Sequence, residues 1–410
     1  MAVTDGNPSV RRLADWNPEP LRDIADEYGT PTYAIDLDRV AANAARLREA
    51  FPGADIAFAV KANSSRAVLE RLAAAGVDAE CAAAGEVKRA LAAGFPAERV
   101  RYTAVNPPAR DLDSVLGTDA AADLTVTVGA EDTLNRVAER GFDGRLCVRV
   151  NPGVGAGHHA KVSTGGEPKF GVPYERAAAV CEQAREVGDL VGIHAHVGSG
   201  VSGDDLAAHR EMVGRMGELA REVGDLSFVA VGGGFGVPYR ESEPPLDLDA
   251  VARSTRDAFG DVNAQLAIEP GRYFVADAGV LLTTVNTVKP TPETTVVGID
   301  AGMTTLARPA LYDAYHAVRS LEPDRPEKKP TRVELAGPVC ETADVLGRGR
   351  RLPAPTRGDL LAVGNAGAYG YEMASNYNSR PRPAVVAVAN GDAWLATRRE
   401  TLADVTRLEP

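Results

Sequence analysis

The chain has 410 residues, 44% of them hydrophobic, which is enough to bury a large core and to form two domains. A net charge of -12 at pH 7 repels nucleic acid and anionic membranes, so neither is expected as a partner. The four cysteines form no Cys-x-x-Cys pair, and the chain shows neither a signal peptide nor an apolar run of about 18 residues, which predicts a cytoplasmic protein without a disulfide framework.

Residues 1–30 are polar, with a short helix expected at Pro20 to Tyr28, and a strand follows at Thr32 to Ile35. From there to about residue 275, short apolar strands alternate with alanine-rich helical stretches, a pattern that predicts a parallel sheet. Eight strand and helix units in this length fit a closed (β/α)8 barrel of the TIM type better than an open sheet. The strand candidates are Ile56–Val60, Val77–Cys81, Val100–Val105, Leu124–Val128, Leu146–Val150, Val191–His196, Phe228–Val231 and Leu266–Glu269.

Polar or glycine residues come at the ends of most of these strands. In chain order they are Lys61, Asn106, Asn151, His196, Gly232–Gly234 and Glu269–Arg272. Active sites of the barrel fold lie at the carboxyl ends of the strands. These residues are therefore expected to meet at one face of the barrel.

After about residue 280 the strands follow one another without long helices, which predicts a second, antiparallel β domain. We expect residues 1–30 to form an N-terminal segment that packs with this β domain, 31–279 to form the barrel, and 280–410 the β domain. The β-domain strand candidates are Val280–Val288, Thr294–Asp300, Tyr315–Arg319, Thr331–Leu335, Asp359–Val363, Ala384–Ala389 and Ala393–Arg398.

Lys61 follows five apolar residues, so it is expected at the end of a buried strand. A buried lysine loses its proton easily and can then form a Schiff base with an aldehyde cofactor. The alternative is a lysine whose ammonium simply reaches water.

Two further strand ends indicate a phosphorylated cofactor. The glycine turn Gly232–Gly234 and Arg272 follow the seventh and eighth strands, where barrels commonly bind phosphate. Glu269 ends a buried strand and needs a partner, which is either Arg272 or the protonated nitrogen of a pyridine ring. Together with Lys61 these features point to pyridoxal phosphate.

His194 and His196 alternate along one strand, so we expect them to face opposite sides, one into the barrel and one toward its helices. This geometry argues against a shared metal ion, and no metal site is expected. A hydrogen-bonded core histidine is the alternative role for His196.

The combined motifs resemble the barrel-type (fold type III) pyridoxal-phosphate decarboxylases of basic amino acids, over nearly the whole chain. The motifs are Phe58–Asn63, the Lys169–Gly171 end of a glycine-rich loop that begins at Gly165, His194–Ser199, Gly232–Gly234, Glu269–Arg272, Gly337–Glu341, Gly367–Tyr369 and Tyr377–Pro383.

This resemblance implies a role for each matching residue. Lys61 would bind the cofactor, His196 would stack on its ring, and Glu269 would pair with its nitrogen. Cys340, the acid that returns a proton, and Glu341 would enter the active site of the partner subunit, so a homodimer with shared sites is implied. The residues implied around the phosphate are Ser199, Gly234, Arg272 and Tyr369, and Gly233 and Gly271 are implied as further cofactor contacts. Arg272 and Tyr369 would also contact substrate.

The stretch Arg308–Tyr312 resembles the motif of the family member that converts meso-2,6-diaminopimelate to L-lysine and carbon dioxide, the last step of lysine biosynthesis. Arg308 and Tyr312 would hold the far carboxylate, and Glu341 is implied as a further substrate contact. An arginine at that place repels a cationic side chain, which disfavours ornithine or arginine as substrate. Asp313 departs from the small residue expected after Tyr312.

Three other functions are weighed against this one. The first is decarboxylation of ornithine, arginine or carboxynorspermidine by the same fold, which Arg308 disfavours. The second is a non-catalytic carrier of pyridoxal phosphate, disfavoured by the full β domain with Cys340 and Glu341. The third is a racemase, which in this fold uses a tyrosine of the second domain as the opposite base, and no such motif is found.

Overall fold

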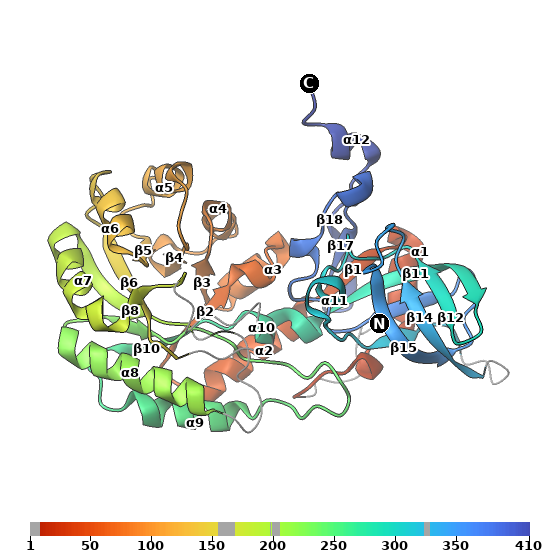
Figure 1. Ribbon diagram of the computed structural model, residues 1–410, viewed down its shortest axis with the longest axis horizontal. Coiled ribbons are helices and arrows are strands. Elements are labelled where there is room, and N and C mark those ends of the chain that lie inside the picture. The colour runs from red at the N-terminus through yellow and green to blue at the C-terminus, as the bar shows by residue number, and fades with distance from the viewer. Residues whose placement is uncertain (1–8, 155–168, 197, 199–205, 324–328) are drawn as a thin grey trace. The chain divides into compact units, whose positions relative to one another are not determined.

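The computed structural model describes residues 9–154, 169–196, 198, 206–323 and 329–410. Its internal contacts divide the chain into two compact units (Figure 1). The barrel unit comprises Asn43–Gly236 and Pro245–Tyr273, and the β unit comprises Met1–Ala42, Val237–Pro244 and Phe274–Pro410.

The barrel unit is built on parallel strands that close into a ring. Neighbouring strands are hydrogen-bonded in the order β5, β4, β3, β2, β10, β9, β8, β6, and a pairing of β5 with β6 closes the barrel. The predicted (β/α)8 barrel is confirmed, with each of its eight strand candidates in place. The strands are β2 (Asp55–Ala59), β3 (Asp78–Cys81), β4 (Val100–Tyr102), β5 (Thr125–Val128), β6 (Arg145–Asn151), β8 (Asp189–His194), β9 (Phe228–Ala230) and β10 (Gln265–Ile268), and the short β7 (Val172–Pro173) also pairs with β6.

Helices lie around the outside of these strands (Figure 1). In α8 (Ala207–Val223) the buried residues Met212, Met216, Leu219 and Val223 recur every three or four positions, so one face of the helix packs on the barrel. None of the helices in the described ranges is long and apolar enough to cross a membrane. The other described α-helices between residues 37 and 275 are α2 (Leu37–Ala50), which precedes β2, α3 (Arg66–Ala74), α4 (Ala84–Ala92), α5 (Ala109–Leu116), α6 (Glu131–Ala138), α7 (Tyr174–Val187), α9 (Leu248–Phe259) and α10 (Arg272–Val275).

The β unit contains a second sheet with the strand order β15-β14-β12-β11-β1-β17-β18, to which β16 and β13 are attached through β11. Most pairings are antiparallel, as predicted, but β1 runs parallel to β17 and β12 parallel to β14, so the sheet is mixed. The strands are β1 (Thr32–Asp36), β11 (Gly279–Pro290), β12 (Thr295–Ile299), β13 (Val318–Ser320), β14 (Pro330–Ala336), β15 (Val345–Pro353), β16 (Leu360–Val363), β17 (Ala384–Ala389) and β18 (Asp392–Thr397).

The N-terminal residues contribute a strand and a helix to the β unit. Helix α1 (Pro18–Tyr28) buries Leu21 and Ile24 in one core with Trp16, Val280 and Val386. The predicted start of the barrel at residue 31 is wrong, because β1 forms its hydrogen bonds with β11 and β17. Strand β15, which the sequence analysis did not predict, carries three arginines that interrupt any apolar alternation.

Candidate active site

Lys61 lies at the carboxyl end of β2, inside a single 3-10 turn, Val60–Ala62. Its Nζ donates a hydrogen bond to Glu80 Oε2 at 2.9 Å, and its side chain is 45% exposed while that of Glu80 is 4% exposed. The predicted position at the strand end is correct, but the predicted burial is wrong, because β2 ends at Ala59 and the turn carries the lysine outward. The amine is held by an ion pair with a buried carboxylate.

Glu269 follows β10 and meets side chains from across the barrel. His194 Nε2, at the end of β8, lies 2.9 Å from Glu269 Oε2, and Arg101 Nη1, on β4, lies 3.8 Å from Oε1. Because β4 and β8 are not neighbours, these side chains meet inside the barrel. Burial alone would raise the pKa of Glu269, but His194, followed by Arg101 and Lys61, lowers it to about 2. The carboxylate is therefore ionised at neutral pH.

His196 lies beyond the end of β8 and also faces the barrel interior. Its Nδ1 accepts a hydrogen bond from the Gly233 N–H at 3.2 Å. Burial, with the nearby charges of Lys61 and Arg149, lowers the pKa of His196 to about 3, so the ring is neutral at pH 7. The prediction that the two histidines face opposite sides is wrong, because β8 ends at His194 and the alternation stops there.

The glycine turn after β9 brings the backbone close to two of these residues. A Cβ on Gly232, which has a φ of +69°, would lie 2.5 Å from His196 Nδ1, and a Cβ on Gly233 would lie 2.3 Å from Glu269 O. Glycine is therefore required at both positions to let the backbone pass the site. Ser199, which the resemblance places beside the phosphate, lies outside the described residues.

Arg308, the first residue of α11 (Arg308–Tyr312), belongs to the β unit and is 3% exposed. Its Nη1 donates to Tyr239 Oη at 2.7 Å and lies 3.2 Å from His316 Nε2. His316 Nδ1 lies 2.8 Å from the Gly364 carbonyl oxygen and donates to it, so Nε2 is the acceptor for Arg308. The sequence analysis missed Tyr239 and His316, because these contacts join three separate stretches of the chain.

Asp313 caps α11 with a φ of 52°, in the left-handed region. Glycine adopts this conformation most readily and aspartate tolerates it, which explains why a small residue was expected here. The aspartate is therefore compatible with the turn that follows Tyr312.

Cys340 and Glu341 are exposed in the β unit. Cys340 Sγ donates to Asn378 Oδ1 at 3.6 Å, and Tyr377 Oη donates to the Glu341 carboxylate, a bond that raises the pKa of Tyr377. The alternative of a buried core cysteine is wrong for Cys340. It does hold for Cys81, Cys147 and Cys181, whose thiol pKa values are raised by burial.

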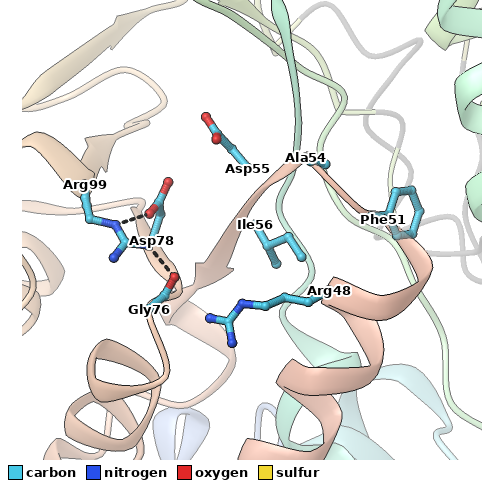
Figure 2. Close-up of a pocket in the computed structure, with 9 residues that line it drawn as sticks. Arg48, Phe51, Ala54, Asp55, Ile56, Gly76, Asp78 and Arg99 are labelled. Carbon is cyan, nitrogen blue, oxygen red and sulfur yellow. Dashed lines mark hydrogen bonds and ion pairs between the residues drawn. The ribbon is translucent and has the colours of Figure 1, made fainter.

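A cavity of about 310 Å³ lies at the other end of the barrel strands, beside Asp55 and Asp78, the first residues of β2 and β3 (Figure 2). Arg99 Nε binds Asp78 at 2.6 Å, while Arg101 Nη2 lies 3.1 Å from Asp55 and 3.4 Å from Asp78. Catalytic residues of barrels come from the opposite, carboxyl ends of the strands. We therefore assign this charged layer a structural role.

Comparisons with known proteins agree with this geometry. Residues 37–276 match the family described as pyridoxal-dependent decarboxylase, pyridoxal binding domain. The diaminopimelate decarboxylase of Methanothermobacter thermautotrophicus is 40% identical over 403 residues, covering 94% of this chain and 92% of that protein. The crystal structure of diaminopimelate decarboxylase from Helicobacter pylori, complexed with L-lysine, has a TM-score of 0.88 at 32% identity, covering 95% of this chain and 99% of that one. A lysine/ornithine decarboxylase from Vibrio vulnificus, complexed with putrescine, has a TM-score of 0.80 at 22% identity over 93% and 100% of the two chains, and shows the shared fold alone.

Proposed function

The chain belongs to the pyridoxal-dependent decarboxylase family, and we propose that it converts meso-2,6-diaminopimelate to L-lysine and carbon dioxide. Relatives named diaminopimelate decarboxylase match it along nearly its whole length. The observation that carries the choice of substrate is the buried guanidinium of Arg308, a cation suited to bind a carboxylate at the far end of the substrate.

Pyridoxal 5'-phosphate is the cofactor, and the residues inside the barrel fit it. Glu269 Oε1 is buried and has no hydrogen-bond partner among the residues that the structure describes, while Oε2 faces His194. An ionised carboxylate with one open oxygen is the acceptor that a protonated pyridine nitrogen needs. When bound, the cofactor supplies the ring that takes up the electrons left behind when carbon dioxide departs.

Lys61 and His196 are the proposed contacts to the rest of the cofactor ring. Lys61 is the amine that binds its aldehyde carbon, and Glu80 holds that amine at the carboxyl end of β2. His196 is neutral, and Gly233 fixes its ring through Nδ1, so its flat face suits stacking on another ring.

The phosphate is proposed to lie at the glycine turn after β9 and the start of α10. Backbone N–H groups of a glycine turn approach anions closely, and an arginine grips phosphate through two N–H groups. The proposed contacts are Ser199, Gly233, Gly234, Gly271, Arg272 and Tyr369.

The working enzyme is proposed to be a homodimer in which each active site takes residues from both subunits. Cys340 and Glu341 are exposed, as expected of side chains that enter the site of a partner subunit. Cys340 Sγ then donates the proton that replaces carbon dioxide on the substrate carbon, and Glu341 contacts the substrate.

Arg308 and Tyr312 are proposed to bind the carboxylate at the far end of the substrate, and Tyr239 and His316 fix the guanidinium. Ornithine and arginine carry a cation at that end, and a buried cation disfavours them. The protein is proposed to act in the cytoplasm, where its free cysteines stay reduced, and its charge of -12 disfavours nucleic acid as a partner.

The test is release of carbon dioxide and formation of L-lysine from meso-diaminopimelate, with ornithine and arginine assayed alongside. K61A is the control and should lose turnover, because it lacks the amine that binds the cofactor. Turnover of ornithine or arginine in place of the meso compound would contradict the assignment of Arg308. If the cofactor-loaded protein turned over none of the three substrates, the proposed activity itself would be contradicted.

A further inference from the structure

His194 forms a buried contact that the resemblance does not explain. Its side chain is 4% exposed, that of Glu269 is 5% exposed, and His194 Nε2 lies 2.9 Å from Glu269 Oε2. We propose that His194 is a positioning residue that keeps the Glu269 carboxylate ionised and directs its open oxygen, Oε1, toward the pyridine nitrogen. This inference rests on the proposed function and assigns His194 a role in it.

The surroundings of the two ring nitrogens of His194 indicate which nitrogen carries the proton. Nδ1 is buried and has no hydrogen-bond partner within the described part of the chain, whereas Nε2 faces the carboxylate. An ionised carboxylate can only accept a hydrogen bond, so this contact requires a proton on Nε2. His194 therefore carries a proton on Nε2 and donates a hydrogen bond to Glu269 Oε2.

The other oxygen of Glu269 stays open because Arg101 is held elsewhere. Arg101 Nη1 is 3.8 Å from Oε1, too far for a hydrogen bond. The opposite nitrogen of that guanidinium, Nη2, is drawn toward Asp55 at 3.1 Å and Asp78 at 3.4 Å. Glu269 thus has one oxygen satisfied by His194 and one buried acceptor left for a single donor, the pyridine N–H.

Several ionisable side chains besides His194 interact electrostatically with Glu269. Arg101 comes from β4, and Lys61 follows β2. Arg149 on β6 and His196 beyond β8 also interact with it electrostatically. Of these residues, His194 lowers the pKa of Glu269 most and opposes the burial that would raise it. Without the N–H of His194, Glu269 is expected to take up a proton at higher pH and to lose its charge toward the cofactor.

Two substitutions of nearly equal shape separate a positioning role from simple packing. Glutamine in H194Q can still donate an N–H to Glu269, whereas methionine in H194M cannot. The matched control is H209M, because His209 is also buried and also bonds through Nε2, to Thr255 Oγ1 at 2.7 Å. Its Nδ1 likewise has no hydrogen-bond partner among the described residues, but His209 lies on α8.

The readouts are kcat, KM and the ¹⁵N resonance of bound pyridoxal phosphate labelled at the pyridine nitrogen, recorded against pH. H194M should lower kcat roughly 10- to 100-fold with KM little changed, the loss expected for a hydrogen bond to a charged group. Its pyridine nitrogen should also lose protonation at a lower pH than in the wild type. H194Q and H209M should resemble the wild type in both respects.

The first condition is that the wild type turns over meso-diaminopimelate. If H194M then has the same kcat and the same pyridine ¹⁵N resonance as the wild type, the inference is overturned. If the wild type itself does not turn over, the proposed function fails, and the nitrogen resonance still tests His194 separately. Should H194M not fold, the imidazole ¹⁵N resonances of the wild-type holoenzyme decide the matter. A proton on Nδ1 of His194 in place of Nε2 would refute the inference.

Discussion

Arg308 combines a structural role with the proposed substrate-binding role, and two substitutions separate these roles. R308M keeps the length of the side chain but removes its charge and its donors. R308K keeps the charge but not the planar fork that binds a carboxylate through two N–H groups. The expected losses follow from the contacts of the wild-type guanidinium with Tyr239 and His316.

The stability cost of R308M comes from the acceptors that lose this donor. His316 is 0% exposed, and an unsatisfied buried acceptor there costs about 1–3 kcal/mol. Tyr239 is half-buried, so losing its bond costs about 0.5–1.5 kcal/mol. The free energy of unfolding should therefore fall by roughly 1.5–4.5 kcal/mol, measured by urea denaturation.

R308M should lower the kcat/KM for meso-diaminopimelate more than that for ornithine. A hydrogen bond to a charged group is worth about 1.5–3 kcal/mol, so kcat/KM for meso-diaminopimelate should fall about 10- to 150-fold. Ornithine has no carboxylate at its far end, so R308M should not lower the kcat/KM for ornithine. R308K should lie between the wild type and R308M.

The matched control is R350M, since the Arg350 Cζ lies 3.8 Å from the ring centre of Tyr315 and this arginine belongs to the same unit. R350M should leave the ratio of kcat/KM for meso-diaminopimelate to that for ornithine unchanged. If R308M, assayed as folded protein, also keeps that ratio, the assignment of Arg308 to the far carboxylate is refuted.

Three further predictions concern the proton donor, the dimer and pH. C340A should lower kcat about 10²- to 10⁴-fold, the usual contribution of a general acid, with KM less affected. When C340A and K61A dimers are mixed and allowed to exchange subunits, part of the activity should return, because each mixed dimer has one complete shared active site. If mass spectrometry shows mixed dimers but no activity returns, the active sites are not shared between subunits. Burial lowers the pKa of His209 from 6.5 to about 4, so the unfolded chain binds a proton that the folded chain does not. This contribution to stability is complete above pH 6.5 and is lost toward pH 4, by up to about 1.4 kcal/mol per pH unit. H209Q should flatten that slope in urea denaturation between pH 6.5 and 4, and an unchanged slope would contradict the cause given.

The barrel could be predicted because its signals are local. A short apolar run that ends in a polar or glycine residue marks both a buried strand and its carboxyl end, and Lys61 and Glu269 were located in this way. The closed barrel then follows from the number of such runs and from the helices between them. Neither step needs information about distant parts of the chain.

The errors have a different physical origin. The assignment of β1 to the barrel failed because its partners, β11 and β17, lie far away in the sequence and nothing local marks the pairing. The predicted orientation of His196 was wrong because β8 ends two residues before it, so the alternation of side chains along the strand does not extend to His196. The contact of His194 with Glu269 depends on the curvature of a closed barrel, which brings together strands that do not pair.

The interior of this barrel carries charges where a purely structural barrel would carry branched apolar side chains. A buried charge is tolerated only when it is paired, and Arg101, whose side chain is 7% exposed, is paired at the amino end of the strands by Asp55 and Asp78. If these carboxylates were absent, the guanidinium would gain by moving onto Glu269 Oε1, the acceptor that the cofactor needs. The charged layer at the amino end of the barrel therefore stabilises the fold and also keeps the carboxyl end free for chemistry.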